Sequence, residues 1–231
     1  MNQLKNMILE GKFPLVMSLP KNDPELARVA WENGADAVKI HINVHHQASG
    51  THFYSFDEEK DNIMQMLKEA KGPMGIVAGG DPVSAENDFE KIIEAGFDFV
   101  SLYSFNYPTS ILLDNRITKM MAPGSGFSES EYQEIENIGA DILEASIFDD
   151  EGSDLTMNGK KYIAYRRVCA NTSLPVLLPT QHKILPSEVV MLKKCGIGAL
   201  MIGAVVTGKE KDGIAKAVKE YRQAIDEMKG C

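Results

Sequence analysis

The chain has few cysteines, no long apolar run and fewer basic than acidic residues. Its three cysteines, at positions 169, 195 and 231, are far apart and form no CxxC pair. Neither a disulfide framework nor a structural zinc site is therefore predicted, and a reducing cytoplasm is the expected location. No stretch approaches the roughly 20 apolar residues of a membrane-spanning helix, and the opening residues lack the apolar core of a secretion signal. We expect neither export nor membrane insertion.

The shortage of positive charge bears on the possible partners. With 33 acidic and 24 basic residues, the formal net charge is −9. A surface of that sign disfavours general binding to nucleic acid or to an anionic membrane. It still allows a local basic pocket for a small anion. We therefore expect no nucleic-acid partner.

What the sequence does contain is a regular alternation of short apolar runs and amphipathic stretches over its 231 residues. Alternation of this kind predicts parallel strands joined by helical crossovers. Eight rounds are present, with strands expected at 13–19, 35–42, 74–78, 97–104, 117–122, 140–147, 175–179 and 199–205. An open doubly wound sheet is the alternative, but it usually ends sooner. The sequence favours one α/β domain over residues 1–231, a closed (β/α)₈ TIM barrel preceded by a short N-terminal helix.

The second expected strand carries the most informative pattern. Lys39, His41 and Asn43 alternate there with Val38, Ile40 and Ile42. Side chains in a strand alternate between two faces, so the three polar groups share one face. Burial of these groups without partners would cost several kcal/mol. We therefore expect them to line a polar cavity.

Active sites of such barrels lie at the C-terminal ends of the strands. In the sixth expected strand, this rule selects Glu144 and Ser146, which alternate with Leu143 and Ala145 and so should face the interior. If Glu144 meets Lys39, the two could act as an acid/base pair on a carbon acid next to a carbonyl. A desolvated Lys39 could instead form a Schiff base. A structural salt bridge from Glu144 to Lys39 or Lys119 is the third interpretation.

Four of the five histidines follow one another closely, at positions 41, 45, 46 and 52. Imidazoles and carboxylates together can hold zinc, iron or manganese. Such a site would need a carboxylate from another strand, such as Asp81 or Glu144, and the spacing of the histidines matches no known ligand motif. The metal interpretation therefore stays open, and no metal ligand is assigned.

Small residues at strand ends indicate where a ligand can approach the backbone. Gly203, Ala204 and Gly208 follow the last expected strand and precede a helix, whose first N–H groups suit an anion such as phosphate. Gly79 and Gly80, which precede Asp81 and Pro82, have the same character after the third strand. Ser18 and Asn43 join these glycines as candidate ligand-binding residues.

At this point the chain resembles the phosphate-binding (β/α)₈ barrels, the superfamily of ribulose-phosphate epimerase, indole-glycerol-phosphate synthase and the N-acylmannosamine-phosphate epimerases. The resemblance is strongest in Leu174-Pro-Val-Leu-Leu-Pro179 and in Leu192–Ala204. The second strand also looks like the His-x-Asp strand of ribulose-phosphate epimerases, but Asn43 stands at the aspartate position. The glycine pair usual after the seventh strand is absent, so the resemblance implies that Gln181, His182 and Lys183 would hold phosphate through their side chains.

These observations predict an enzyme that acts on a phosphorylated small molecule, with a sugar phosphate as the expected substrate. Proton abstraction or carbon–carbon bond chemistry is expected, of the epimerase, isomerase or aldolase-like lyase type, with Lys39, His41 and Glu144 as acid/base candidates. Two alternatives stay open: a non-catalytic barrel that binds a phosphorylated metabolite, and a metal-dependent hydrolase or isomerase that uses the histidines. No cofactor is predicted, a divalent metal remains an option, and a homodimer is a general expectation.

Overall fold

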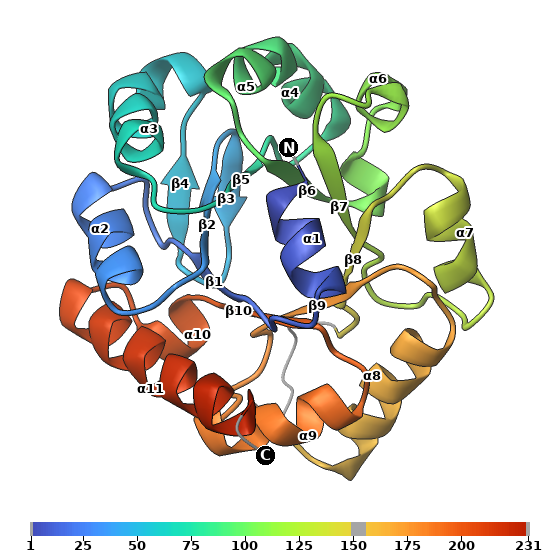
Figure 1. Ribbon diagram of the computed structural model, residues 1–231. Coiled ribbons are helices and arrows are strands. Elements are labelled where there is room, and N and C mark those ends of the chain that lie inside the picture. The colour runs from blue at the N-terminus through green and yellow to red at the C-terminus, as the bar shows by residue number, and fades with distance from the viewer. Residues whose placement is uncertain (1, 149–155, 230–231) are drawn as a thin grey trace.

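Eight parallel strands close into one barrel in the computed structural model, which describes residues 2–148 and 156–229. The order around the ring is β1-β10-β9-β8-β7-β6-β5-β2, and helices surround it (Figure 1). The barrel strands are β1 (Leu15–Ser18), β2 (Ala37–His41), β5 (Met74–Val77), β6 (Phe99–Tyr103), β7 (Thr118–Ala122), β8 (Ile142–Glu144), β9 (Val176–Pro179) and β10 (Ala199–Ile202). The predicted (β/α)₈ barrel is therefore confirmed.

The helices lie outside the barrel, except for the first, which covers one end of it (Figure 1). They are α1 (Gln3–Leu9), α2 (Pro24–Glu32), α3 (Phe56–Glu69), α4 (Pro82–Asn87), α5 (Phe89–Ala95), α6 (Thr109–Leu113), α7 (Glu131–Asn137), α8 (Gly159–Ala170), α9 (Val189–Lys194), α10 (Ala204–Thr207) and α11 (Lys211–Lys229). Two short 3₁₀ helices, η1 (Ser104–Asn106) and η2 (Pro186–Glu188), follow β6 and precede α9. None of the described helices is both long and apolar enough to cross a membrane.

Alternation along the strands divides the apolar residues into two clusters. Val38 and Ile40 of β2 pack outward against the helices, whereas Ala37 of the same strand belongs to the interior cluster. In the interior, the Phe99 ring occupies the space that a side chain at position 75 would need, which explains glycine there. Leu4 and Ile8 of α1 complete the interior cluster. Helix α1 therefore closes the N-terminal end of the barrel with apolar side chains.

Aspartates at the starts of strands hold backbone amides at this same end. Asp98 accepts hydrogen bonds from the N–H groups of Gln3 and Leu4, each at 3.0 Å, and so fixes the first turn of α1. Asp36 and Asp141 each follow a glycine that ends a helix, and they accept from the amides of Leu15 and Lys119. The carboxylates satisfy donors that would otherwise be unpaired at the ends of the elements.

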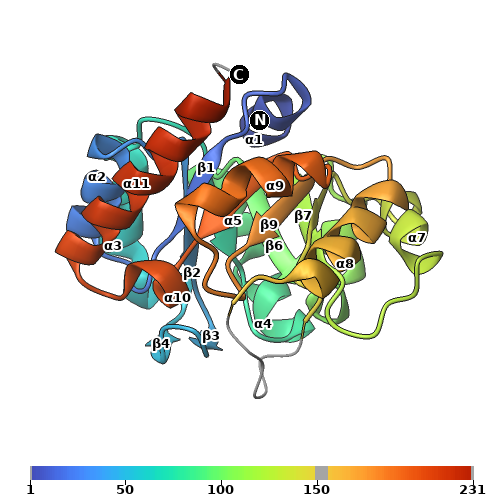
Figure 2. The same ribbon diagram turned by 90° about the horizontal axis from the view of Figure 1, so that it is seen from below.

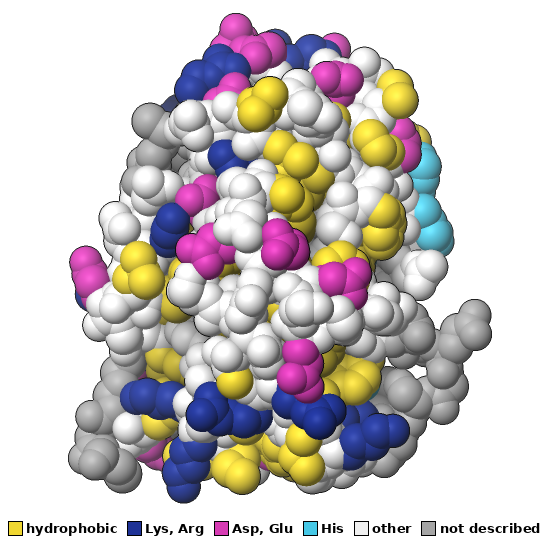
Figure 3. Space-filling view, turned by 90° about the vertical axis from the view of Figure 1, so that its right-hand side faces the viewer, with side chains coloured by type: hydrophobic (Ala, Val, Ile, Leu, Met, Phe, Trp, Pro, Cys, Tyr) yellow, Lys and Arg dark blue, Asp and Glu magenta, His cyan; other side chains and the backbone are white. Residues whose placement is uncertain are grey.

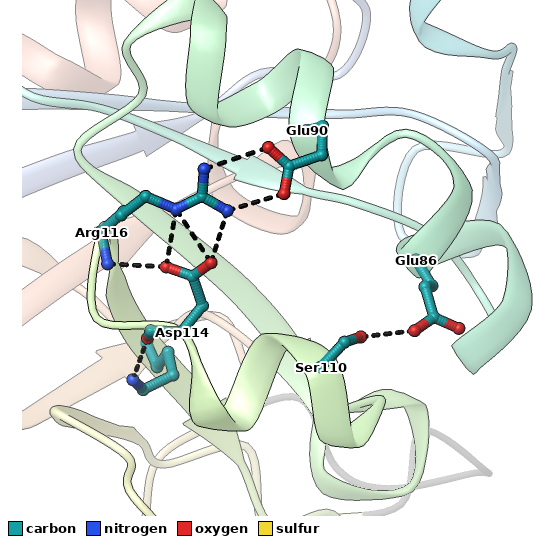
Figure 4. Close-up of polar contacts among 6 residues, drawn as sticks. Glu86, Glu90, Ser110, Asp114 and Arg116 are labelled. Carbon is teal, nitrogen blue, oxygen red and sulfur yellow. Dashed lines mark hydrogen bonds and ion pairs between the residues drawn. The ribbon is translucent and has the colours of Figure 1, made fainter.

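A further ion-pair network joins the connection before β7 to α5 (Figure 4). The Arg116 guanidinium binds Glu90 and Asp114 with nitrogen–oxygen distances of 2.6 Å to each. The ammonium of Lys119 donates to the backbone oxygen of Asp114 at 2.6 Å. Lys119 therefore binds outside the barrel, and the sequence interpretation that paired it with Glu144 is wrong.

Two segments differ from the strand pattern that the sequence predicts. The stretch expected as strand 199–205 ends at Ile202, and its last residues form α10. The histidine-rich segment after β2 lies outside every expected strand, yet it forms an antiparallel hairpin of β3 (Val44–His46) and β4 (Thr51–Phe53). The hairpin lies at the end of the molecule opposite α1 (Figure 2). It therefore stands beside the C-terminal ends of the barrel strands.

Positive charge gathers on one part of the outer face of the barrel. Lys and Arg side chains collect along the lower edge in Figure 3, where α8 and α9 lie. The exposed basic residues of these two helices are Lys160, Arg166, Arg167, Lys193 and Lys194. These basic residues lie on helices outside the barrel, so they do not form the local basic pocket that the composition allows.

Candidate active site

A cavity of about 960 Å³ opens at the C-terminal end of the barrel, and each of the eight strands contributes to its wall. Most of the predicted site residues line it, namely Ser18, Lys39, His41, Gly79, Gly80, Glu144, Gln181, Gly203 and Ala204. Asn43, His182 and Gly208 do not. Cavities of this size usually accommodate a small organic ligand. Most of the predicted residues therefore lie together in one candidate site.

Lys39 and Glu144 meet in this cavity from opposite sides of the barrel. The Lys39 Nζ lies 3.9 Å from Glu144 Oε2, and the side chains are only 7% and 9% exposed. Ser101 Oγ donates a 2.6 Å hydrogen bond to the same oxygen. Burial of two charges is costly, and the 3.9 Å separation is longer than a strong charge-assisted hydrogen bond. This is a poor arrangement for stability alone and a suitable one for proton transfer to a ligand.

Two histidines stand next to this pair and are neutral at neutral pH. Burial, aided by the positive charges of His46 and Lys39, lowers the pKa of His41 well below its ordinary value. Burial, aided by Lys39 and His45, likewise lowers the pKa of His46 to about 4. The two rings lie 4.4 Å apart between centroids, and His46 Nδ1 is 2.9 Å from Ser49 Oγ. His41 and His46 therefore present polar but uncharged rings to the cavity.

The histidines do not form a metal-binding group with other side chains. Over residues 2–148 and 156–229, no three His, Cys, Asp or Glu side chains converge as metal ligands would. His45 and His52 face each other across the β3–β4 hairpin with ring centroids 6.5 Å apart. Asp81, a candidate carboxylate, instead caps helix α4. The described part of the chain thus supplies no donor set for the metal interpretation.

The glycines after β5 have a packing role. A Cβ at Gly79 would lie 2.5 Å from Ser84 Oγ and 2.7 Å from the backbone nitrogen of Ala85, so only glycine lets α4 approach. The carboxylate of Asp81 accepts hydrogen bonds from the amides of Val83 and Ser84 at 2.9 and 3.0 Å. The first turn of α4 therefore already holds a negative group from its own chain, and the amides of Val83 and Ser84 are not open to a ligand.

The turn after β10 is different. Gly203 N–H donates to Thr180 Oγ1 at 3.1 Å, and its backbone is extended, with φ −148°. The next two amides, of Ala204 and Val205, have no acceptor among the described residues, and no side chain caps α10. Both residues line the cavity. Gly208 instead ends α10 with φ 67°, a conformation that favours glycine, and lies outside the cavity.

Asn43 was expected to line the cavity but has a structural role outside it. Strand β2 ends at His41, and Asn43 adopts a left-handed backbone with φ 53°, so the alternation of the strand no longer applies. Its Nδ2 donates to Asp88 Oδ2 at 2.9 Å, and Asp88 also binds Lys91 and the amide of Phe56. An amide can donate to that carboxylate and an aspartate cannot. This contact therefore requires a donor at position 43, which the asparagine amide supplies.

Gln181 and His182 are placed differently from each other. The Gln181 side-chain oxygen accepts from the amide of Ile147 at 3.0 Å. Its side-chain nitrogen, Nε2, donates to the Phe148 carbonyl at 2.7 Å. Gln181 therefore lines the cavity while it fixes the loop after β8. His182 is 1% exposed and packs against the Phe148 ring, with centroids 4.9 Å apart. Both side chains are engaged with the protein.

Several wall residues are absent from the predicted set. Ser101 binds Glu144, and Tyr103 Oη lies 2.9 Å from Ser146 Oγ. Thr180 accepts from Gly203. Alternation through Phe99, Ser101 and Tyr103 would have placed Ser101 inside the barrel, as it did for Glu144. Thr180 follows the end of β9, where the rule that active sites lie at the C-terminal ends of the strands would have selected it.

Comparison with known proteins identifies the fold. No protein-family model and no curated protein sequence matches the chain. Thiamine phosphate pyrophosphorylase from Pyrococcus furiosus is similar over 95% of this chain and 98% of that chain, with a TM-score of 0.65 and 20% identity. Tryptophan synthase from M. tuberculosis matches over 96% and 98%, with a TM-score of 0.71 and 9% identity. The tryptophan synthase alpha-subunit from Pyrococcus furiosus matches over 94% and 98%, with a TM-score of 0.68 and 13% identity.

These neighbours are (β/α)₈ barrels, and the resemblance that the sequence predicts is confirmed as a likeness of fold. At such low identity, fold and chemistry are separate questions, because one barrel supports many reactions. The chemistry must therefore come from the residues of this cavity.

Proposed function

We propose that the protein is an enzyme that acts on a phosphorylated small molecule, of the sugar phosphate class, by proton transfer in epimerase, isomerase or lyase chemistry. The observation that carries the proposal is the buried Lys39–Glu144 pair, 3.9 Å apart at the cavity wall. The structural neighbours support it through their names, which include a thiamine phosphate pyrophosphorylase.

The pair suits proton abstraction next to a carbonyl group. Glu144 Oε2 is held by Ser101, and Oε1 makes no hydrogen bond to a described residue, so Oε1 can accept a proton from carbon. Lys39 reaches the same place from the other side and can donate a proton to carbon or to a developing enolate oxygen. A second reaction of the same groups is also consistent with the proposal. Lys39, after its proton passes to Glu144, adds to the carbonyl carbon, and Glu144 returns the proton to the carbonyl oxygen, which leaves as water to give an imine.

The open amides after β10 are the proposed phosphate anchor. The N–H groups of Ala204 and Val205 begin a helix and line the cavity without an acceptor among the described residues. Backbone amides at a helix start bind anions through hydrogen bonds and the local dipole. Lys39 supplies a positive charge to the same cavity.

Replacement of one amide tests the anchor. Ala204→Pro removes the N–H at the first helical position, where proline fits, and the extended backbone of Gly203 tolerates a following proline. Loss of a hydrogen bond to a charged group should weaken binding of inorganic phosphate and sugar phosphates by about tenfold or more in calorimetry. Gly159→Pro is the matched control, because Gly159 starts α8 after an extended Asn158 and lies outside the cavity.

Replacement of the acid/base groups tests the chemistry. Sugar phosphates that shift the unfolding midpoint would be incubated in deuterium oxide with wild type, Lys39→Met and Glu144→Gln, and carbon-bound deuterium would be measured by NMR. Wild type should exchange, and each variant should lose about a hundredfold or more while it still binds. Binding without exchange or turnover would identify a non-catalytic binding protein. Activity abolished by a chelator would indicate the metal-dependent alternative.

A further inference from the structure

Charge of opposite sign is segregated into two neighbouring stretches of the chain. Residues 120–158 contain no lysine or arginine, and residues 159–187 contain no aspartate or glutamate. Helix α7 lies in the first stretch and α8 in the second. In α11, by contrast, acidic and basic residues are interspersed. Two consecutive helices on the outside of the barrel therefore carry opposite charge.

These charges form two adjoining surfaces on the face of the molecule seen in Figure 3. Acidic side chains cross the middle of this view, and basic side chains follow its lower edge. The acidic surface consists of the exposed residues Glu129, Glu131, Glu134 and Glu136, on α7 and just before it. The basic surface consists of the exposed α8 residues Lys160, Arg166 and Arg167.

Most of these charges have no partner of opposite sign in the described part of the chain. Arg167 Nε lies 3.2 Å from Glu129 Oε1, and this exposed ion pair joins the two surfaces. Lys160 and Arg166 form no ion pair with a described residue, and no described lysine or arginine pairs with the three glutamates of α7. Like charges gathered on one surface repel one another. A partner of opposite charge would relieve this repulsion.

An apolar groove lies between the two surfaces. Its volume is about 220 Å³, and its apolar lining consists of Phe127, Tyr132, Ile147, Phe148 and Ala164. Ile163, which precedes Ala164 on α8, is 61% exposed. The same face thus carries an apolar groove, an exposed apolar side chain beside it, and a charged surface of each sign. Such a face is complementary to itself.

We propose that this face is the interface of a homodimer, with the two-fold axis along the boundary between α7 and α8. Rotation about this axis places α8 of each copy on α7 of the other, so that the basic surface meets the acidic one twice and Ile163 enters the partner's groove. The Arg167–Glu129 pair shows that the two surfaces lie at the same height along the barrel, as this rotation requires. An axis across the helices would instead place like charges together.

The first test is the oligomeric state of the wild-type chain. The helices are short, so the contact is small, and we expect a reversible dimer that salt weakens. Sedimentation velocity at about 10 to 500 µM protein in low salt should show a dimer. About 0.5 M salt should dissociate it. A monomer throughout in low salt would overturn the inference, as would binding to anionic lipid vesicles without self-association.

Charge reversal identifies the surfaces. Glu134→Lys and Arg166→Glu each replace attraction by repulsion at two places in the dimer and should weaken it about tenfold or more. An equal mixture of the two variants has opposite charges at both places, so its dimer should return to within about threefold of wild type. A different partner protein on this face would not give this recovery. Failure of the mixture to recover would overturn the inference.

A matched pair of variants controls for net charge. Glu227→Lys and Lys219→Glu make the same charge changes at exposed positions of α11. Each should dimerise as wild type does, within about twofold. Equal weakening by these variants and by those of α7 and α8 would show that net charge alone governs association, and would overturn the inference.

The groove is tested through the side chain proposed to enter it. Ile163→Ala removes two buried apolar side chains per dimer and should weaken the dimer about tenfold or more. Leu9→Ala is the control, because Leu9 is 62% exposed on α1, at the end of the barrel. A dimer that Ile163→Ala leaves unchanged would overturn the inference, since the contact would then lie on another face. Neither Ile163 nor the charged residues line the cavity at the barrel mouth, so this result is independent of the proposed function.

Discussion

Two strand ends of this barrel carry glycine ahead of a short helix, and only one of the two helices begins with amides that have no acceptor in the described part of the chain. After β5, Asp81 binds the first amides of α4, and Gly79 is needed so that the helix can pack. After β10, the amides of Ala204 and Val205 have no acceptor in the described part of the chain. A glycine turn by itself is thus a weak sign of phosphate binding. Whether the amides that follow it already have an acceptor is the more informative observation.

The largest expected effect that separates the two turns is on stability. Gly79→Ala would place a Cβ 2.7 Å from the backbone nitrogen of Ala85, which cannot move without shifting α4. Overpacking of this kind costs about 1–3 kcal/mol, to be measured by urea unfolding. Unchanged stability of Gly79→Ala would show that α4 moves easily, and the packing role of this glycine would be wrong.

The next prediction separates capping from ligand binding. Asp81→Ala removes the carboxylate that caps α4 and should lower the free energy of unfolding by about 1 kcal/mol. Asp81 does not line the cavity, so the affinity for inorganic phosphate should stay within about twofold of wild type. Ala204→Pro should do the reverse, with stability retained and affinity reduced. A loss of phosphate affinity in Asp81→Ala would move the anchor to the β5 turn.

The pH dependence of phosphate binding sharpens the same comparison. Burial lowers the pKa of His46 to about 4, so that ring neither gains nor loses charge between about pH 5.5 and about pH 8. Burial also lowers the pKa of His41 well below its ordinary value. A sugar phosphate, as a phosphate monoester, gains its second charge near pH 6. Binding by amides and Lys39 should therefore hold or rise a few-fold as the pH increases. Calorimetry that shows a loss of affinity through pH 6–7 would indicate a protonated histidine as the anchor.

The smallest expected effect is at the second glycine. A Cβ at Gly203 would meet Ser18 at 3.6 Å, an ordinary contact, and the extended backbone there suits any residue. Gly203→Ala should therefore change the free energy of unfolding by less than about 0.5 kcal/mol, in contrast to Gly79→Ala. A cost as large as that of Gly79→Ala would show that both glycines serve packing.

The fold could be predicted because its signals are local. Each of the eight strands overlaps its expected stretch, since a buried parallel strand is a short apolar run wherever it occurs. Alternation likewise placed Lys39, His41 and Glu144 inside the barrel. It failed at Asn43, because β2 ends at His41 and a left-handed backbone then directs the side chain to Asp88.

The site was predictable only in part, because some contacts depend on the folded arrangement. The β5 turn carried a readable signal, since aspartate followed by proline is typical of a helix start and predicts that Asp81 caps α4. The stack of Tyr103 and Phe105 and the Thr180–Gly203 hydrogen bond have no such signal. They arise from loop geometry and from the meeting of neighbouring strand ends.

The most direct test of the account is an NMR titration of the backbone amides with inorganic phosphate. The account predicts that the signals of Ala204 and Val205 move in a saturable manner, as amides do when they donate to an anion, while those of Val83 and Ser84 stay in place under their Asp81 cap. Movement of Val83 and Ser84 with Ala204 and Val205 unchanged would contradict it.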